Sequence, residues 1–500
     1  MMSRVLHRKT GIEYFFPGWY NYKKQKGGIM EIFKEDLFSK TEVLRAMDNM
    51  NSFGIRLTGS KGQSDFVDYL KSEIKKTGLS VVEKEYAFDR WQSDSASLSV
   101  DGEQIKISSV FPYSGLTPDE GVTGRLVKVK NSAVGFKKAR GKIGVVEIKN
   151  LRRISSKVAF DKRRSYPENL EIEKSYRGPV STAFVKTLLT FGSLKHSGAK
   201  AIICIWRDMS DEMVEGQYLN FIMDYLSVPV VWVNSTEGDK VLKAAAEKKS
   251  ATVTVKGSIE RGAKTSSFYT VIGGTENTKE AIIINTHTDG LNFCEENGGV
   301  GMLSMIKYFK AHPTKRNLIF AFVTGHFRLP KFRTGFDQAT SRFLADFKPL
   351  WNGKTYKAVA GCSVEHLGCT EYKDIDGKYQ KTNDVDVELV YTGNKKVDKI
   401  YYEALEGRKV CRTMTLRGHN FMHFGEGQPL FNKKIPEIAL VTAPDYLCSV
   451  DANHHMDKFN LDLMCEQIET FVRCVLLLDE KSAKQIGKAQ GYSLGLGRLK

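Results

Sequence analysis

Near-continuous apolar runs alternate with amphipathic segments over the C-terminal half of the chain. Residues 280–285 (EAIIIN), 317–323 (NLIFAFV), 357–364 (KAVAGCSV) and 436–443 (PEIALVTA) are apolar at most positions. Strands that are covered on both faces have this composition. Residues 299–312 (GVGMLSMIKYFKAH), between the first two runs, place their apolar side chains at helical spacing. The alternation predicts an α/β fold with a doubly wound, mainly parallel sheet.

Helical periodicity is also found in two further segments, one near the N-terminus and one near the C-terminus of the chain. Residues 64–79 (SDFVDYLKSEIKKTGL) repeat apolar positions at helical spacing, with Ser64 as the expected cap. The strand LSVVEKEYAF is expected to follow directly after this helix. Residues 460–478 (NLDLMCEQIETFVRCVLLL) predict a closing helix that Asn460 caps.

The pattern changes in the middle of the chain, where short β-branched runs follow one another between turns. Such runs predict a small β-rich domain, placed at residues 121–264 and inserted into a larger one. The larger α/β domain then comprises residues 41–120 and 265–480, between a basic tail at 1–40 and a second tail at 481–500. The short runs are GRLVKV, GKIGVVEI, KAIICIW, VPVVWV and ATVTVKG.

The composition narrows the class of protein. A chain of 500 residues exceeds what one hydrophobic core usually serves, so two or three domains are expected. No apolar run reaches the roughly 18 residues of a spanning helix and no secretory signal is recognised, so we expect a cytoplasmic protein without a membrane span. We interpret the net charge of +17 as lysines spread over a solvated surface, not as a site for nucleic acid or anionic membranes. The eight cysteines form no CxxC pair and are expected to be reduced and mostly buried.

Histidines and carboxylates gather where the predicted strands end. Ligands of open α/β sheets bind just beyond the carboxyl ends of the strands. Five of the ten histidines follow one of the four runs described above, which is more than a scatter of surface histidines predicts. The side chains at these ends are, in chain order, His287 and Asp289, then His326, then Glu365 and His366, then His454 and His455.

The residue types at these ends suit a divalent transition metal such as zinc. Neutral imidazole and carboxylate are ordinary zinc ligands, and a carboxylate can bridge two ions. An aspartate two residues beyond a ligating histidine can orient the imidazole, and His287 and Asp289 have this spacing. In the stretch THTDGLNFCEENGG, Glu295 and Glu296 follow before a glycine pair leads into a helix. The stretch is therefore predicted to be a metal-site loop.

The order of these motifs resembles the zinc aminopeptidase and glutamate carboxypeptidase superfamily, which is peptidase family twenty-eight. That family carries His-x-Asp, then Asp-Asn-x-x-Gly, then a Glu-Glu pair at the next strand end, an Asp after a further strand and a late His. Here HTDG, EENGG and EHLG occur in the same order. The inserted block, with GKIGVVEI, HSGAKAIICIW and VPVVWVNSTEGDKVLKAAA, resembles a protease-associated domain. The resemblance covers residues 45–480 and implies a peptidase-like fold with one or two zinc ions.

The resemblance also implies roles for individual residues. His287 would ligate a first metal ion, and Asp289 would orient it as a catalytic residue. Glu296 takes the place of the bridging aspartate ligand, with Asn297 kept beside it as a substrate-binding residue. Glu365 takes the place of the later aspartate ligand. In both carboxylate positions glutamate replaces aspartate, which moves the oxygens outward by about one methylene group.

Later motifs complete the candidate site. His455 is expected to be the last histidine ligand because MDKFNLDLM, which follows it, matches the closing helix of the family; His454 is the alternative. Residues 418–431 (GHNFMHFGEGQPLF) precede the last strand and can line a substrate pocket through His423 and Glu426. An ordinary loop with surface histidines is the alternative interpretation of that segment.

At the Glu-Glu pair of the family, this chain has residues of a different chemical type. Where the family has its Glu-Glu pair, this chain has His326 and Phe327, and phenylalanine cannot bind a metal. His326 can act as a general base near neutral pH, or it can become a ligand itself. His366, also a candidate substrate-binding residue, and Glu295 are spare groups that can restore the coordination.

Two functions therefore follow from the sequence. The first is a metal-dependent, aminopeptidase-like hydrolase that acts on a peptide or small amide substrate through an altered metal and base site. The second is a catalytically inactive binding or scaffold protein that keeps the peptidase fold. The missing Glu-Glu pair favours the second, whereas the four retained candidate ligands favour the first.

Overall fold

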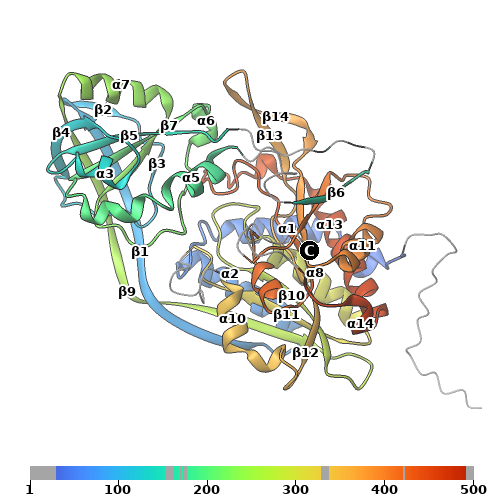
Figure 1. The fold of residues 1–500 in the computed structure, drawn as a ribbon. Helices are drawn as coiled ribbons and strands as arrows, with labels where there is room; N and C mark the ends of the chain where they lie inside the picture. The colour runs from blue at the N-terminus through green and yellow to red at the C-terminus, as the bar shows by residue number, and fades with distance from the viewer. Residues whose placement is uncertain are drawn as a thin grey trace, which may run out of the picture.

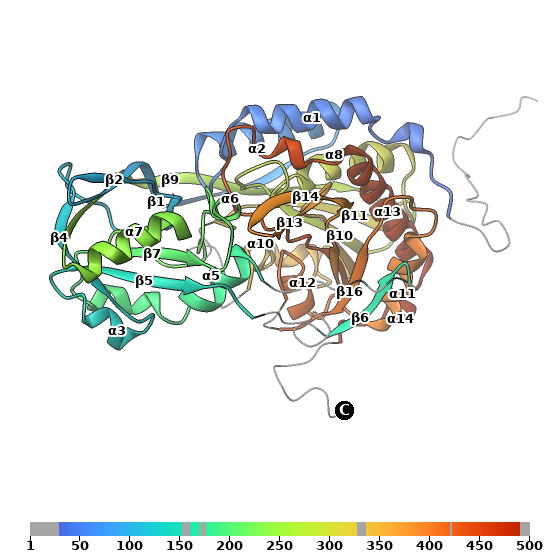
Figure 2. The same ribbon diagram turned by 90° about the horizontal axis from the view of Figure 1, so that it is seen from above.

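Two lobes joined by a pair of long strands make up the protein, as seen in the computed structural model (Figures 1 and 2). The strands are β1 (Val82–Val100) and β9 (Ser250–Ile272), which pair antiparallel over most of their length. One sheet continues through both lobes, since β9 belongs to each. The structure describes residues 30–152, 161–168, 170, 172, 177–327, 337–420 and 423–490.

The sheet of the first lobe is parallel at its centre. Its strands lie in the order β9, β11, β10, β12, β17, β15, β16 and β6. Strands β11, β10, β12 and β17 pair in parallel, and β9 and β15 flank them antiparallel. The bounds are β10 (Glu280–His287), β11 (Asn317–Val323), β12 (Lys357–Ser363), β17 (Glu437–Leu440), β15 (Glu388–Thr392), β16 (Thr413–Arg417) and β6 (Lys162–Tyr166).

Helices cover both faces of this sheet (Figure 2). On one face α1 (Lys40–Ser52), α2 (Lys61–Lys76), α8 (Gly298–Ala311) and α13 (Leu461–Glu480) pack against one another. On the other lie α10 (Thr340–Asp346) and α12 (Gln428–Asn432). The remaining elements of the lobe are η1 (Lys34–Asp36), η3 (Lys348–Leu350), α11 (Lys395–Ala404), η4 (Met456–Lys458), α14 (Ala483–Ile486) and the hairpin of β13 (Thr370–Ile375) and β14 (Lys378–Val385).

The second lobe has a smaller parallel sheet. Its central strands are β4 (Val122–Lys128), β5 (Ile143–Lys149), β7 (Ala201–Arg207) and β8 (Val230–Val233). One face has a buried cluster of its own, whereas the other, where Trp206 stacks on Trp232, joins the core of the first lobe. The other elements are β2 (Glu103–Ile105), β3 (Ser109–Val110), α3 (Ala133–Lys137), α5 (Pro179–Thr187), η2 (Phe191–His196), α6 (Asp211–Val214) and α7 (Ser235–Ala246).

The predicted mixed α/β fold with a mainly parallel central sheet is confirmed, while some element limits differ. Asn460 caps α13 by accepting a hydrogen bond from the Leu463 backbone N–H, as expected. The first predicted helix starts earlier than expected, because Ser60 and not Ser64 accepts the capping hydrogen bond, from the Gln63 backbone N–H.

The division into two domains stays a prediction. Strands β5 and β10 are not neighbours, since β4, β9 and β11 lie between them. Strand β9, however, passes without a break through residue 264, where the inserted domain was expected to end. Residues 30–40, assigned to the basic tail, pack on the first lobe: Phe33 stacks on His312, and Lys34 pairs with Glu469 on α13. The rest of that tail lies outside the described residues.

Two further expectations concern the whole chain. All eight cysteines are free thiols, and six of them are buried. Among the residues that the structure describes, no helix combines the length and the apolar character needed to cross a bilayer.

Candidate metal centre

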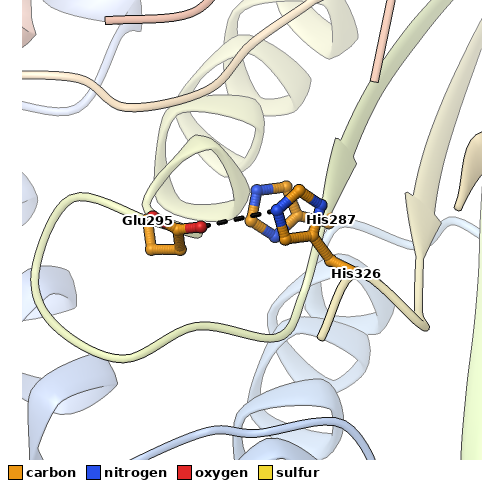
Figure 3. A group of neighbouring side chains, drawn as sticks. All are labelled: His287, Glu295 and His326. Carbon is orange, nitrogen blue, oxygen red and sulfur yellow. Dashed lines mark ion pairs between the residues drawn. The ribbon is translucent and has the colours of Figure 1, made fainter. Parts of the chain in front are cut away.

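Three neighbouring parallel strands deliver the side chains of the candidate site. Strand β10 ends at His287, His326 follows the end of β11, and Glu365 and His366 follow the end of β12. Because these strands lie side by side and run in one direction, their carboxyl ends meet at one edge of the sheet. The imidazole rings of His287 and His326 stack with their centroids 4.1 Å apart (Figure 3).

The loop between β10 and α8 adds a carboxylate. Glu295 points back toward the two stacked rings, with its Oε1 3.5 Å from Nε2 of His326 (Figure 3). Its Oε2 lies 4.0 Å from Nε2 of His366, and Oε2 of Glu365 lies 4.0 Å from Nε2 of His287. His287 thus belongs to two possible metal-binding groups, one with Glu295 and His326 and one with Glu365 and His366.

Four buried polar atoms in this cluster have no hydrogen-bond partner among the described residues. They are Nε2 of His287, Oε2 of Glu295, Oε2 of Glu365 and Nε2 of His366. Buried polar atoms in native proteins are nearly always partnered, so these four atoms, which belong to two groups that share His287, indicate a bound ligand. Nitrogen and carboxylate oxygen are the donors that zinc prefers.

The histidine tautomers suit metal binding. Nδ1 of His287 lies 2.8 Å from the backbone oxygen of Asp289, and Nδ1 of His366 lies 2.6 Å from that of Thr442. A carbonyl oxygen accepts only, so both Nδ1 atoms carry a proton and donate it. Each neutral ring then presents the lone pair of Nε2 to the cluster, as in histidines whose other nitrogen is held by a carbonyl oxygen.

The electrostatics of the cluster favour a bound cation. Burial, together with the neighbouring imidazoles, lowers the pKa of His287 well below its usual value, which keeps the ring neutral. Burial and the nearby charge of Glu426 raise the pKa of Glu365 well above its usual value. A divalent cation would supply the missing counter-charge for this carboxylate and would bind the neutral imidazole.

His326 is held differently from the other histidines. Its Nδ1 lies 3.1 Å from Oε1 of Glu426, while its Nε2 faces Glu295. Burial alone would lower the pKa of His326, but the hydrogen bonds and charges of these two glutamates outweigh burial and raise it to about 10. Glu426 is fixed in turn, because its Oε2 accepts a hydrogen bond of 2.7 Å from the Thr340 backbone N–H. Glu426 thus holds His326, and its assignment to substrate binding stays a prediction.

The structure does not bring Glu296 to His287. The Glu296 carboxylate turns away from the cluster and pairs with the guanidinium of Arg56. Arg56 is fully buried and also donates to the backbone oxygen of Asn292, at 2.7 Å. A buried guanidinium requires a carboxylate partner, and this requirement decides which of the two adjacent glutamates faces the metal centre. Glu295 is the one that remains available.

His455 also lies apart from the cluster. Its Nε2 lies 2.6 Å from the hydroxyl of Ser449, and its Nδ1 lies 3.9 Å from a carboxylate oxygen of Asp451. The alternative residue, His454, uses its backbone oxygen to accept a hydrogen bond from the Phe293 N–H. His366, next to Glu365 in the sequence, stands in the cluster where a late histidine was expected.

Asn297 and Asp289, both assigned roles by the resemblance, have backbone partners. The side-chain amide of Asn297 donates to the oxygen and accepts from the N–H of Leu367, both at 2.8 Å. It thereby ties the loop that carries Glu295 to the segment that follows His366. Asp289 contacts Nδ1 of His287 through its backbone oxygen, while its carboxylate accepts from the Gly325 N–H at 3.1 Å.

His423 stands outside both metal-binding groups. Its ring stacks on Tyr391 with centroids 4.1 Å apart. Burial lowers the pKa of His423 to about 3, and neither ring nitrogen has a partner among the described residues. Its assignment to substrate binding stays a prediction.

The second lobe reaches the centre through Phe221, which the sequence analysis did not identify. The Phe221 ring lies 5.3 Å from that of His326 and 4.8 Å from that of Phe327. Phe327, which stands where the family has a carboxylate, is therefore part of an apolar wall. No local motif marks Phe221, because its position follows from the packing of one lobe on the other.

These features match a known fold. The chain has the fold of the zinc aminopeptidases: a zinc aminopeptidase from Bacillus subtilis superposes with a TM-score of 0.60 and 14% identity, over 89% of this chain and 97% of that one. The aminopeptidase from Aneurinibacillus sp. strain AM-1 gives a TM-score of 0.57 and 16% identity, over 89% and 95%. A peptidase M28 precursor from Shewanella amazonensis SB2B gives 0.60 and 11%, over 89% and 95%.

Sequence similarity is confined to a shorter stretch. The chain is 28% identical over 117 residues to a probable leucine aminopeptidase 2 from Arthroderma benhamiae, and likewise to leucine aminopeptidase 2 from Trichophyton rubrum. Each match covers 23% of this chain and 23% of the relative, so the similarity spans about a quarter of the relatives' length. No family model matches the chain.

Proposed function

We propose that the protein is a metal-dependent hydrolase of peptide or other amide bonds, similar to an aminopeptidase. The proposed ligands of its zinc are His287, Glu295, Glu365 and His366. The observation that carries this proposal is the set of four buried donor atoms without a partner among the described residues, which lie in two possible metal-binding groups that share His287. The zinc aminopeptidase fold and the leucine aminopeptidase relatives support it.

Each part of the chemistry then has a residue to perform it. Zinc, when bound, would polarise the substrate carbonyl and lower the pKa of water. Without metal, Glu295 and Glu426 keep His326 protonated. The charge of Glu295 would be offset by the zinc that it holds, and this would lower the pKa of His326. The neutral ring would then accept a proton from the attacking water and return it to the leaving amine, as a general base and then a general acid. Glu426 would orient the ring through Nδ1, so that Nε2 faces the reacting groups. Phe221 and Phe327 would exclude bulk water from that side.

A binding or scaffold role without turnover is the second candidate function. The enclosure of the site favours it, because His287 is fully buried and His326 is 7% exposed. Turnover of a panel of aminoacyl amides and short peptides by the zinc-loaded protein separates the two candidates. Hydrolysis of any of them supports the hydrolase, and saturable binding without hydrolysis supports the second candidate.

The ligand set predicts opposite results for two histidines. His287→Ala should abolish stoichiometric zinc binding, because it removes the donor that both groups share. His455→Ala should retain the zinc held by the proposed ligands, because His455 belongs to a separate possible metal-binding group, with Asp451 and Asp457. Elemental analysis of the purified variants measures this. Since a ligand that binds only the folded state raises its stability, a chelator should lower the melting temperature of the wild type but not that of His287→Ala.

The same pair of variants can contradict the assignment. Loss of zinc from His455→Ala with retention in His287→Ala would restore the family's late histidine as a ligand and overturn the set proposed above. Circular dichroism of both variants controls for misfolding.

A further inference from the structure

Helix α3 lies at the outer end of the second lobe (Figure 2), and the sequence in and around it is rich in basic residues. Residues 121–146 contain lysines and arginines but no aspartate or glutamate, and the same holds for residues 177–207. Most lysines and arginines in these two stretches therefore have no acidic residue close to them in the sequence. The exposed basic residues used below, named the basic patch, are Lys130, Lys137, Lys138, Arg140, Lys195 and Lys200.

Folding brings the two acid-free stretches together. The Gly141 N–H donates to the backbone oxygen of Gly198, and the Lys200 N–H donates to that of Lys142, both at 2.8 Å. Beneath the surface the ring of Phe136 on α3 packs edge-on against that of Phe191 on η2, at 5.5 Å. The patch is therefore a built surface of two segments that lie far apart in the sequence. The expectation that lysines are spread over the surface of the chain as a whole stays a prediction.

Aliphatic side chains protrude beside the basic patch. Val134 is 73% exposed and lies one helical turn before Lys137 and Lys138, so the three share one side of α3. Leu189 is 89% exposed. The residue after it, Thr190, donates through its hydroxyl to the side-chain oxygen of Asn131, at 2.9 Å, which links this loop to the turn before α3. Two large apolar side chains thus project to solvent next to a cluster of cations.

We propose that this end of the second lobe docks on a membrane leaflet that carries anionic headgroups. The basic patch would face the headgroups, while Val134 and Leu189 would enter the boundary between headgroups and acyl chains. Interfacial binding combines these two contributions, the attraction of Lys and Arg to anionic lipid and the burial of apolar side chains. A site for single-stranded nucleic acid fits less well, because such sites use aromatic side chains for stacking, and the protruding side chains here are aliphatic.

Vesicle sedimentation with the full-length protein tests the proposal. Binding is expected to vesicles that mix phosphatidylserine with phosphatidylcholine, to be absent with phosphatidylcholine alone, and to weaken as salt is added. The triple variant Lys130→Glu, Lys137→Glu, Lys138→Glu should lose binding, at about five-fold or more per position, since each basic residue near the surface contributes about that factor. The double variant Val134→Ser, Leu189→Ser should bind several-fold more weakly at unchanged net charge.

A matched variant separates a specific surface from the general positive charge. Lys310→Glu, Lys354→Glu, Lys399→Glu changes the net charge equally at exposed lysines of the first lobe, and it should bind vesicles like the wild type. Equal loss of binding in the two triple variants would overturn the proposal. The proposal would also be overturned if the wild type bound a single-stranded oligonucleotide but no vesicles, and if the first triple variant lost that oligonucleotide binding. Melting temperatures of the three variants should match that of the wild type, since the substituted side chains are exposed.

Discussion

His326→Ala is expected to lower turnover of the best amide substrate by about 10²–10⁴-fold, the usual contribution of a positioned acid–base group. The zinc content should stay unchanged, because the four proposed ligands do not include this ring. Its two nitrogens already face Glu426 and Glu295, which places it beside the metal centre in the position of a proton carrier. Steady-state kinetics and elemental analysis of the same preparation measure both quantities.

Two companion variants show whether the loss is due to proton transfer. Glu426→Gln keeps the shape of the side chain but removes the charge that favours the protonated ring, so it should shift the acidic limb of the pH profile to lower pH. His196→Ala, at an exposed position of the second lobe, should leave turnover as in the wild type. If His326→Ala instead loses zinc, His326 is a ligand. If neither zinc nor turnover changes, His326 has no role in the chemistry.

Arg56→Ala should lower the free energy of unfolding by about 3–5 kcal/mol, the usual cost of removing one partner from a buried ion pair. The substitution leaves the Glu296 carboxylate buried without its guanidinium, and it also removes the hydrogen bond to the Asn292 backbone oxygen. Urea denaturation, followed by fluorescence, measures the change.

A double variant shows whether Arg56→Ala destabilises the protein by leaving a buried charge unpaired or by leaving a cavity. Arg56→Met with Glu296→Met removes both charges and fills the space, and it should recover much of the stability, because apolar replacement of a buried pair is often close to neutral. Arg261→Ala, which breaks an exposed ion pair with Asp89, should leave the free energy almost unchanged. A double variant as unstable as Arg56→Ala would show that the guanidinium acts through its backbone contacts alone.

The sheet and the edge that carries the candidate site could be predicted because each depends on local patterns. Apolar runs identify strands wherever they lie, and the polar residues that follow them mark the edge where ligands bind. His287, Glu365 and His326 were placed correctly at this edge for that reason. Their roles in binding and catalysis stay predictions.

The choice between neighbouring groups could not be predicted in the same way. Glu295 and Glu296 are adjacent and chemically alike, and a distant residue, Arg56, decides which of them faces the cluster. His366 and His455 were both possible histidine ligands. The folded structure groups His366 with His287 and Glu365, whereas His455 contacts Ser449. Phe221 belongs to another lobe, so no pattern near the metal-site loop could reveal it.

The two strands that run through both lobes limit how the protein can open. A flexible linker would let the lobes swing apart, but β1 and β9 keep their backbone hydrogen bonds across the junction. Their register shifts between Phe88 and Arg90 and again between Ser93 and Ser95. Irregularities of this kind are where paired strands bend and twist. Any movement of one lobe relative to the other therefore has to bend or twist this pair of strands, and these two points are where the pair yields most readily.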